Sequence, residues 1–341
     1  MSTLRSIEII GGGLAGLSLG LALRRHGVPV TLHEAGFYPR HRVCGEFVAG
    51  LDTETTERLQ LAPFFAGARH HREVTWHGRG GFVVRHRLPK AALGLSRYTL
   101  DTRLAHAFSA AGGRLFERSR VDLASCAPGR VVATGRRRDG SAWLGLKVHV
   151  RRLVLDGDLE LHLGDQAYVG LAGVEDDRVN VCGLFRRRPL PEAAPETLLE
   201  SYLRASGLER LAGRLATAEP WVESRAAIAG LNFARPTAQP DRLVLGDTFS
   251  AIPPFTGDGM AMALQSAAIA LPALLAWSRG AASWEDTLRA IHRRLRRRFA
   301  LRLVFARTLH PWLLAPATQH VLTHTRTSRW LPFKLLYHAL H

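Results

Sequence analysis

Cysteine and lysine are both scarce in this sequence of 341 residues. The three cysteines, Cys44, Cys126 and Cys182, are too few and too scattered for a disulfide framework, so we expect reduced thiols in a cytoplasmic protein. The first predicted strand begins close to Met1, and we therefore expect no signal peptide. Only three of the 46 basic residues are lysines, so arginine carries nearly all of the positive charge.

Long apolar runs and nucleic-acid recognition motifs are also missing. The most apolar long stretch, residues 261–277, contains Gln265, Ser266 and Pro272. It falls short of the ~20 residues of a membrane-spanning helix, so we expect a buried core helix. A net charge of +17 would by itself suggest nucleic-acid binding. Because the sequence has no recognition motif and no basic patch interleaved with aromatic residues, we expect no nucleic-acid partner.

The spacing of a standard metal site is absent as well. His70, His71 and His77 lie close together in the sequence, but their spacing matches no standard zinc site. We expect solvated loop histidines and no metal. The hydrophobic content of 46% is high enough for a sizeable core, so a globular protein is expected.

What the sequence does have is a glycine-rich turn near its start. The apolar run Ile7–Ile10 predicts a buried strand, and residues 14–26 predict a helix. Gly11, Gly13 and Gly16 have the Gly-x-Gly-x-x-Gly spacing that is typical of dinucleotide-binding proteins. The first glycine permits the tight turn, the second lets the backbone approach a pyrophosphate, and the third lets the helix pack on the strand.

The helix and the next strand complete a dinucleotide-binding unit. N–H groups in the first helical turn, around Ala15, would face the pyrophosphate. A second strand over residues 28–33 ends at Glu34, where a carboxylate can bond the ribose hydroxyls of an adenosine. Strand, glycines, helix, strand and acid in this order predict a bound dinucleotide.

The rest of the chain alternates between further nucleotide-domain elements and an antiparallel insert. Helices are predicted at residues 51–60, at 101–111 with Asp101 as the N-cap, at 196–214 with an interruption at Gly207, from Gly257 onward, and at 284–341. Strands are predicted as a hairpin over 73–76 and 82–85, at 114–117, 121–126 and 130–133, four times between 142 and 185, and at 242–245.

The sequence therefore predicts an α/β protein with a Rossmann-like nucleotide-binding domain split along the chain, an inserted antiparallel β-sheet domain for the substrate and a helical C-terminus. The expected domains are residues 1–62, 97–138 and 236–283 for the nucleotide, 63–96 and 139–235 for the substrate, and 284–341 for the C-terminal helices. A dehydrogenase that uses NAD usually keeps its Rossmann half contiguous. The split favours a flavin enzyme that holds its cofactor at several points.

Four motifs in order resemble the flavoprotein superfamily of aromatic hydroxylases, geranylgeranyl reductases and flavin halogenases, over roughly residues 5–290. The first is the glycine motif with Glu34. The second is Arg97 with Asp101, because the family places an arginine near the FAD phosphates at this point. The third is Ala133-Thr134-Gly135-Arg136, in the place of the family's Asp-Gly motif and with a threonine instead of the aspartate. The fourth is Leu245-Gly246-Asp247 with residues 253–260, which is similar to the family's Gly-Asp motif and the loop under the flavin ring.

This resemblance implies FAD as the cofactor and NAD(P)H as the reductant. A strand-end carboxylate at Asp247 can accept a hydrogen bond from a ribityl hydroxyl, and a helix that opens at Gly257 and Gly259 can direct its N–H groups at an anionic reduced flavin. The residues expected to bind the cofactor are Gly11, Gly13, Ala15, Gly16, Glu34, Arg42, Cys44, Gly45, Arg97, Gly135, Gly246, Asp247, Pro254, Gly257, Asp258, Gly259 and Met260.

The predicted substrate strand departs from the specialised branches of the family. Tyr168 stands where the reductases carry Tyr-x-Trp-x-Phe-Pro, but Gly170, Ala172 and Gly173 replace the three bulky residues. Large-to-small changes favour a wider pocket, for an apolar substrate bulkier than one prenyl chain. The Trp-x-Trp-x-Ile motif of the halogenases is missing, so halogenation is not expected.

Cys44 and Tyr168 are the candidate catalytic residues near the flavin ring. Cys44-Gly45 resembles the Cys-Gly pair of geranylgeranyl reductases, although a small buried residue in a turn would give the same pattern. Three functions stay open: an NAD(P)H-driven monooxygenase acting on an apolar aromatic, quinone or polyketide-like substrate, a reductase of prenyl double bonds, and a flavin-binding protein without catalysis.

The C-terminal segment is amphipathic and basic. Leu288, Ile291, Leu295, Phe299 and Leu303 recur at helical spacing, and arginines fill most of the remaining circumference. Such helices with Trp and Phe can lie in a membrane interface, but they more commonly pack on a core. Peripheral association of residues 286–341 with an anionic membrane, at its inner face, is therefore one expectation and ordinary packing is the other.

Overall fold

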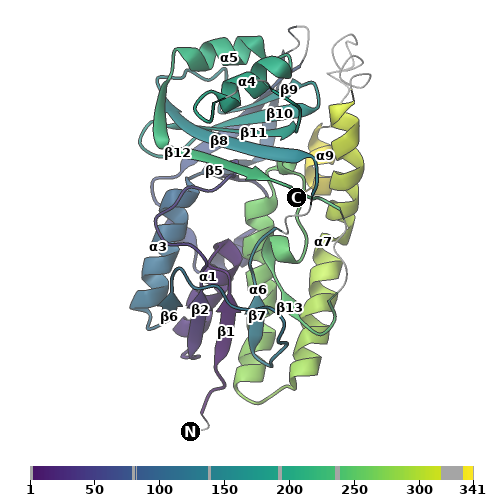
Figure 1. Cartoon of the computed structure of the whole chain (residues 1–341). Coiled ribbons are helices and arrows are strands. Elements are labelled where there is room, and N and C mark those ends of the chain that lie inside the picture. Colours follow the sequence, from purple (N-terminus) through teal and green to yellow (C-terminus); the bar gives the residue numbers. More distant parts are fainter. Residues whose placement is uncertain are drawn as a thin grey trace.

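The computed structural model describes residues 3–78, 81, 83–136, 140–190, 194–234, 239–315 and 333–340. It contains two β-sheets, a five-stranded sheet that begins at the N-terminus and an eight-stranded sheet stacked above it in Figure 1. A long C-terminal helix runs beside both (Figure 1).

The five-stranded sheet is parallel and has the order β13-β7-β1-β2-β6. Its strands are β1 (Ile7–Ile10), β2 (Val30–His33), β6 (Arg114–Phe116), β7 (Arg130–Val132) and β13 (Leu243–Val244). The helices packed around it include α1 (Leu14–Arg25), α3 (Arg97–Ala110) and α6 (Gly259–Ser278). Three segments far apart in the sequence thus build one Rossmann-like sheet, as predicted.

The eight-stranded sheet has the order β12-β8-β11-β10-β9-β4-β5-β3. Its strands are β3 (Phe47–Val48), β4 (Arg69–His77), β5 (Val83–Gly94), β8 (Trp143–Arg151), β9 (Leu159–Gly164), β10 (Ala167–Gly173), β11 (Val179–Arg186) and β12 (Glu219–Ala229). All pairs are antiparallel except β4 with β9, which are parallel. The helices α4 (Leu198–Ala205) and α5 (Glu209–Ala216) cover its outer face (Figure 1). The predicted fold class is therefore confirmed, with one parallel pair in the insert.

Two helices determine how the C-terminal third packs. α6 is long and apolar enough to cross a membrane by length and composition, but 61% of its apolar window is buried inside the protein, as expected for a core helix. α7 (Trp284–Leu314) packs along it, and the five apolar residues predicted to share one face are all buried in the core. The short α9 (Phe333–Leu340) follows. Residues 316–332, including Trp330, lie outside the described residues.

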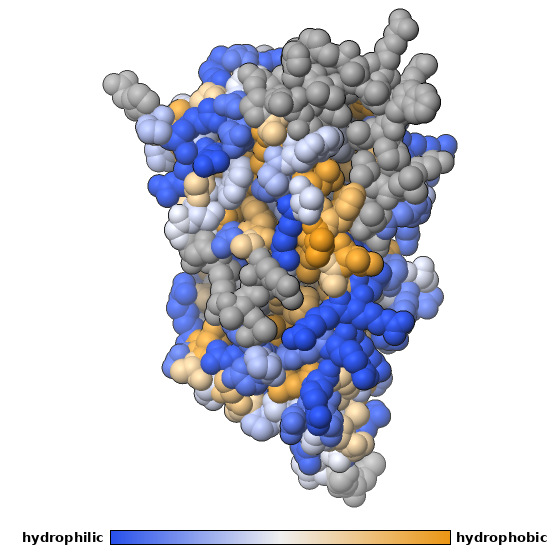
Figure 2. Space-filling view, turned by 90° about the vertical axis from the view of Figure 1, so that its right-hand side faces the viewer, coloured by the Kyte–Doolittle hydropathy of each residue, from blue (hydrophilic) through white to orange (hydrophobic). Residues whose placement is uncertain are grey.

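The outer surface of α7 is basic and partly apolar. Figure 2 views this side of the molecule and shows hydrophilic side chains over its lower part with hydrophobic side chains gathered above them. Leu301, Val304 and Trp312 are the exposed large apolar residues on α7. They lie on the helix after the arginine-rich stretch 293–298.

Several predicted elements differ from the structure. α3 begins at Arg97 instead of Asp101, because the hydroxyl of Ser96 caps it by accepting the N–H of Thr99 at 3.0 Å. The predicted strand over 121–126 does not form, and the helix predicted over 51–60 is only α2 (Thr53–Arg58). The strand β12 was not predicted. It is an edge strand with a mostly exposed pattern, which leaves little apolar alternation to detect.

Candidate functional site

A cavity of about 980 Å³ lies between the two sheets. It extends from the glycine-rich turn and Glu34 at one end to Tyr168 and Gly170 at the other. Of the predicted site residues, Gly16 and Asp258 alone are absent from its lining among the residues that the structure describes. The cavity thus brings together residues from all four sequence motifs.

The three glycines of the N-terminal turn have different surroundings. A Cβ atom on Gly11 would lie 2.2 Å from the carbonyl oxygen of Ala133, and Gly11 also has a φ of +112°. A Cβ atom on Gly16 would lie 2.0 Å from the carbonyl oxygen of Gly11. A Cβ atom on Gly13 would meet nothing closer than Arg97 Nη2, at 3.9 Å. Two glycines therefore serve packing, whereas Gly13 keeps space open in the cavity.

The open space beside Gly13 is suited to a phosphate. Gly13 is the N-cap of α1 and no side chain caps the helix there, so the positive end of the helix faces the cavity near Ala15. The guanidinium of Arg97 adds a positive charge. Asp101 holds it in place by accepting hydrogen bonds from Nε and Nη2, at 2.7 and 2.8 Å. Burial would lower the pKa of Arg97, but Asp101 outweighs this effect and raises it.

Glu34 ends β2 at the far end of the cavity. Its carboxylate accepts the N–H groups of Gly12 and Gly36, at 2.9 and 2.8 Å, and contacts Arg40 and Arg42. Burial would raise the pKa of Glu34, but the two arginines and the two N–H groups lower it. The group is therefore a charged acceptor, as ribose recognition requires. Arg42 also reaches Asp101, with 3.0 Å between Nε and Oδ2, and so links this end to the phosphate region.

The turn after β13 forms the wall near the middle of the cavity. Gly246 has a φ of +60°, and the carboxylate of Asp247 lies 2.7 Å from Nε of Arg136. The N–H group of Gly135 donates to the hydroxyl of Thr248, at 2.9 Å. The third and fourth motifs therefore contact each other directly.

The loop before α6 contributes both lining and anchoring residues. Pro254, Gly257, Gly259 and Met260 line the cavity. Asp258 is fully buried and its carboxylate faces Arg302 of α7, at 3.5 Å. Asp258 therefore anchors the loop to α7, and any contact it makes with a cofactor would come from its backbone.

A buried charged cluster, not predicted from the sequence, holds the Cys44-Gly45 turn. Glu46 is fully buried and contacts Lys147 Nζ at 2.6 Å and His149 Nε2 at 2.5 Å, both on β8. Burial would raise the pKa of Glu46, but Lys147 and His149 lower it. The side-chain amide of Asn180 donates to the carbonyl oxygens of Cys44 and Gly45, each at 2.9 Å. The only signal in the sequence was a lysine and a histidine inside an otherwise apolar strand.

The end of the cavity opposite Glu34 is lined by alternate residues of the large sheet. Tyr168 and Gly170 on β10 pair with Leu184 and Cys182 on β11, so all four point to the same face. A Cβ atom on Gly170 would meet nothing closer than 3.9 Å. Burial raises the pKa of Tyr168 well above its usual value, and its hydroxyl accepts the N–H of Phe255, at 3.2 Å. The phenol therefore keeps its proton.

Sequence reasoning missed two further contributions to this cavity. α9 adds Phe333, Tyr337 and Leu340 to the lining, and Phe333 stacks on His86 of β5 with ring centroids 4.3 Å apart. His41 also lines the cavity, where its ring stacks on Tyr98. No local pattern in the sequence connects this C-terminal helix to the cavity.

The residues present fit FAD. Gly13 leaves the cradle that a Cβ atom would fill, α1 offers uncapped N–H groups, and Glu34 offers a charged acceptor. The cavity then continues past Asp247 to Cys44 and Gly45. A dinucleotide with a bulky ring system at its second end matches this succession of phosphate, ribose and apolar sites.

Comparison with known proteins supports the same fold. No protein-family model and no curated protein sequence matches the chain. Solved structures do match. The flavin-dependent brominase Bmp2 is 15% identical, with 98% of this chain and 94% of that chain covered and a TM-score of 0.72. PqsL of P. aeruginosa, in complex with 2-aminobenzoylacetate, is 16% identical over 95% of this chain and 100% of that one, with a TM-score of 0.72.

A geranylgeranyl bacteriochlorophyll reductase-like protein from Thermoplasma acidophilum is also similar. It is 14% identical over 93% of this chain and 90% of that chain, with a TM-score of 0.71. Identities at this level establish the fold alone. The fold expected from the four motifs is thereby confirmed.

Proposed function

We propose that this chain, which has the fold of FAD-dependent monooxygenases, flavin-dependent halogenases and geranylgeranyl reductase-like proteins, binds FAD and works as an NAD(P)H-driven monooxygenase. Its substrate is an apolar aromatic, quinone or polyketide-like molecule. The observation that carries this proposal is one continuous cavity, with a phosphate cradle at Gly13 and an open apolar chamber beside Gly170.

The cofactor would be held by residues with separate tasks. Arg97 and the N-terminus of α1 offset the charge of the pyrophosphate, and Glu34 accepts hydrogen bonds from ribose hydroxyls. Asp247 would accept a hydrogen bond from the ribityl chain. Bound FAD would supply the redox chemistry, accepting electrons from NAD(P)H and delivering them to molecular oxygen.

The chain's own residues would position the substrate and keep the chamber dry. Leu161, Leu184 and Phe255 line the chamber with apolar surface, which excludes water from the reacting centre. Tyr168 keeps the proton on Oη and can donate it to a substrate oxygen. The Glu46 cluster fixes the Cys44-Gly45 turn from behind, so that this wall of the cavity stays rigid.

A prenyl reductase is the second candidate. It is favoured by the Cys44-Gly45 turn and by the Thr256-Gly257-Asp258-Gly259 loop, because both resemble the geranylgeranyl reductase branch and both contribute to the cavity wall. The glycine at position 170 counts against it, since it leaves the chamber wider than one prenyl chain needs.

Turnover with and without oxygen separates the candidates. The FAD-loaded protein would be given NADPH or NADH with an aromatic probe such as 1-naphthol, or with geranylgeraniol, under labelled dioxygen and under argon. A monooxygenase inserts one labelled oxygen atom into the aromatic probe and needs oxygen. A reductase hydrogenates the prenyl probe under argon. A protein that loads with FAD but does neither would support the flavin-binding alternative.

A further inference from the structure

A second group of polar side chains lies on the face of the large sheet that carries α4 and α5. His77 ends β4, and Glu160 and His162 lie on β9. The parallel pairing of these strands puts His77 directly beside His162. Glu160 lies two residues before His162 and therefore on the same face. Tyr168 and Gly170 point to the opposite face, so the two histidines lie across the sheet from the cofactor cavity, and Glu160 alone of the three also borders it.

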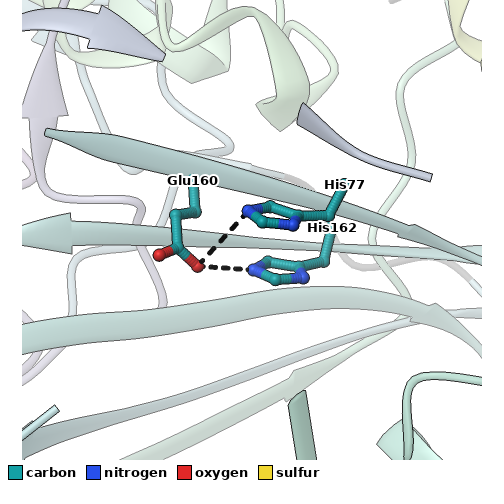
Figure 3. Close-up of side chains that lie close together, drawn as sticks. All are labelled: His77, Glu160 and His162. Carbon is teal, nitrogen blue, oxygen red and sulfur yellow. Dashed lines mark hydrogen bonds and ion pairs between the residues drawn. The ribbon is translucent and has the colours of Figure 1, made fainter. Parts of the chain in front are cut away.

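The three side chains converge on one point. Figure 3 shows the two imidazole rings one above the other, with the Glu160 carboxylate facing both. The rings are stacked, with centroids 4.2 Å apart and planes 3° from parallel. Oε2 of Glu160 lies 2.6 Å from Nε2 of His162 and 3.9 Å from Nε2 of His77. The ligand atoms of the three residues all lie within 4.8 Å of one another.

The surroundings of His77 give the clearest indication that this group binds a ligand. Its side chain is only 10% exposed, and its buried Nε2 atom has no hydrogen-bond partner among the described residues. Such atoms are rare and call for an explanation. A metal ion bound to Nε2 would supply the missing partner.

The carboxylates around the histidines supply the remaining ligands. Oδ2 of Asp156 lies 3.6 Å from Nε2 of His77, and Asp156 is half-exposed, which leaves a path for an ion to enter. Arg214 of α5 contacts Oε2 and Oε1 of Glu160 at 2.8 and 3.0 Å. These contacts fix the orientation of the carboxylate, as the outer partners of metal ligands commonly do.

We propose that His77, Glu160 and His162, with Asp156 as the fourth ligand, bind a divalent transition-metal ion of the zinc type. Two neutral imidazoles and two carboxylates balance the charge of the ion, and imidazole ligands favour zinc over magnesium or calcium. His162 would bind the ion through Nε2 as the neutral ring with its proton on Nδ1, and this bond would replace the present contact with Glu160. Bonds of roughly 2.0–2.2 Å require the two stacked rings to tilt toward the ion, because an imidazole binds a metal in the plane of its ring.

A metal here would join three elements that have no covalent link nearby. It would tie β4 to β9 and, through Glu160 and Arg214, to α5. The site is structural and independent of FAD, so the proposal stands whether or not the function proposed above is correct.

Metal uptake by the stripped protein tests the site. Tag-free protein would be dialysed against a chelator and titrated with Zn²⁺ by calorimetry, and the bound metal measured by mass spectrometry. We expect about one Zn²⁺ per chain. Co²⁺ in place of Zn²⁺ should give the visible absorption of a four-coordinate site. Wild-type protein that takes up neither ion would overturn the proposal.

Variants locate the bound ion. His77→Ala and His162→Gln should each weaken Zn²⁺ binding by at least ~10-fold. His70→Ala is the matched control, because His70 is an exposed histidine on the same strand, and its binding should equal that of wild type. Circular dichroism and FAD content report whether each variant folds. Uptake that is unchanged in both folded ligand variants would place the ion elsewhere and refute the site.

Discussion

At the scale of single residues, the three glycines of the glycine-rich turn have different roles: two are required for packing, and the third leaves space for the proposed ligand. A Cβ atom on Gly11 or Gly16 would overlap backbone atoms of the protein itself, whereas a Cβ atom on Gly13 would enter open space in the cavity. A substitution at each position should therefore damage a different property of the protein.

Gly13→Val should abolish FAD binding without unfolding the chain, because the added side chain occupies the space for the pyrophosphate. Gly11→Ala should instead lower the thermal midpoint, because its Cβ atom would overlap the backbone at Ala133. Flavin absorbance and circular dichroism, measured on both variants, check the pair. Full FAD content in folded Gly13→Val would show that the phosphate does not lie there.

Gly170→Trp tests the substrate chamber. The position lines the cavity and has room for a side chain, since a Cβ atom there would meet nothing closer than 3.9 Å. We expect unchanged FAD content and at least a ~10-fold loss of kcat/KM with a bulky aromatic substrate, equivalent to about 1.4 kcal/mol. Gly213→Trp, at an open position on α5, is the control. Kinetics like those of wild type would show that Gly170 does not face the substrate.

The residues of the cavity differ in how far the sequence could predict them. Gly13, Glu34 and Asp247 were found because each stands in a local pattern of strand, turn and helix. Glu46 was not found, because Lys147 and His149 are 101 and 103 residues away in the sequence. Contacts of this range depend on how the two sheets stack, which no local periodicity reports.

At the scale of elements, α7 has one face buried in the core and another exposed on the surface of the molecule. Its apolar face is buried against the core, so the expectation of ordinary packing is correct for that face. Its outer side still carries Leu301, Val304 and Trp312 at helical spacing, and they are 85%, 63% and 47% exposed. We propose that this stripe, with the arginines at 293–298, binds anionic lipid peripherally.

Vesicle co-sedimentation tests the proposed lipid contact. The protein should sediment with vesicles that contain phosphatidylglycerol at low salt, and binding should fade at high salt because surface charges are screened. Leu301→Asp should weaken it, whereas Val154→Asp, at an equally exposed apolar residue elsewhere, should not. Equal binding by both variants, or none by wild type at low salt, would refute a lipid contact at α7.

Prediction of elements succeeded where the pattern was strong. The strands β8 to β11 and the core helix α6 are rich in buried apolar residues, and they form close to the predicted positions. The predicted start of α3 was wrong because Ser96 and Asp101 are both good caps. In the structure Ser96 caps the helix, and Asp101 lies one turn inside it, where it pairs with Arg97 four residues earlier. The same contact makes the predicted cap part of the proposed phosphate site.

At the scale of the whole molecule, buried histidines should make stability depend on pH. Burial lowers the pKa of His310 to about 4, and burial with nearby Lys147 and His149 lowers that of His41 to about 4. Because the unfolded values are near 6.5, the unfolded chain binds more protons between pH 4 and 6.5. The stability from these neutral rings is full above pH 6.5 and is lost as the pH falls toward 4.

The free energy of unfolding, measured with urea, should therefore fall between pH 7 and pH 5, by at most about 1.4 kcal/mol per histidine and pH unit. His310→Phe should flatten this fall and keep the packing, because His310 already stacks among aromatic rings that include Tyr168 and Phe255. An identical slope in wild type and His310→Phe would show that His310 titrates normally in the folded protein.

Bound flavin gives the most direct test of the proposed cofactor site. The purified protein, after incubation with FAD and removal of the excess, would be precipitated with acid and the flavin in the supernatant identified and counted. We expect noncovalent FAD at about one molecule per chain, released into the supernatant. A colourless protein that FAD cannot reconstitute would contradict the cofactor site and the function built on it.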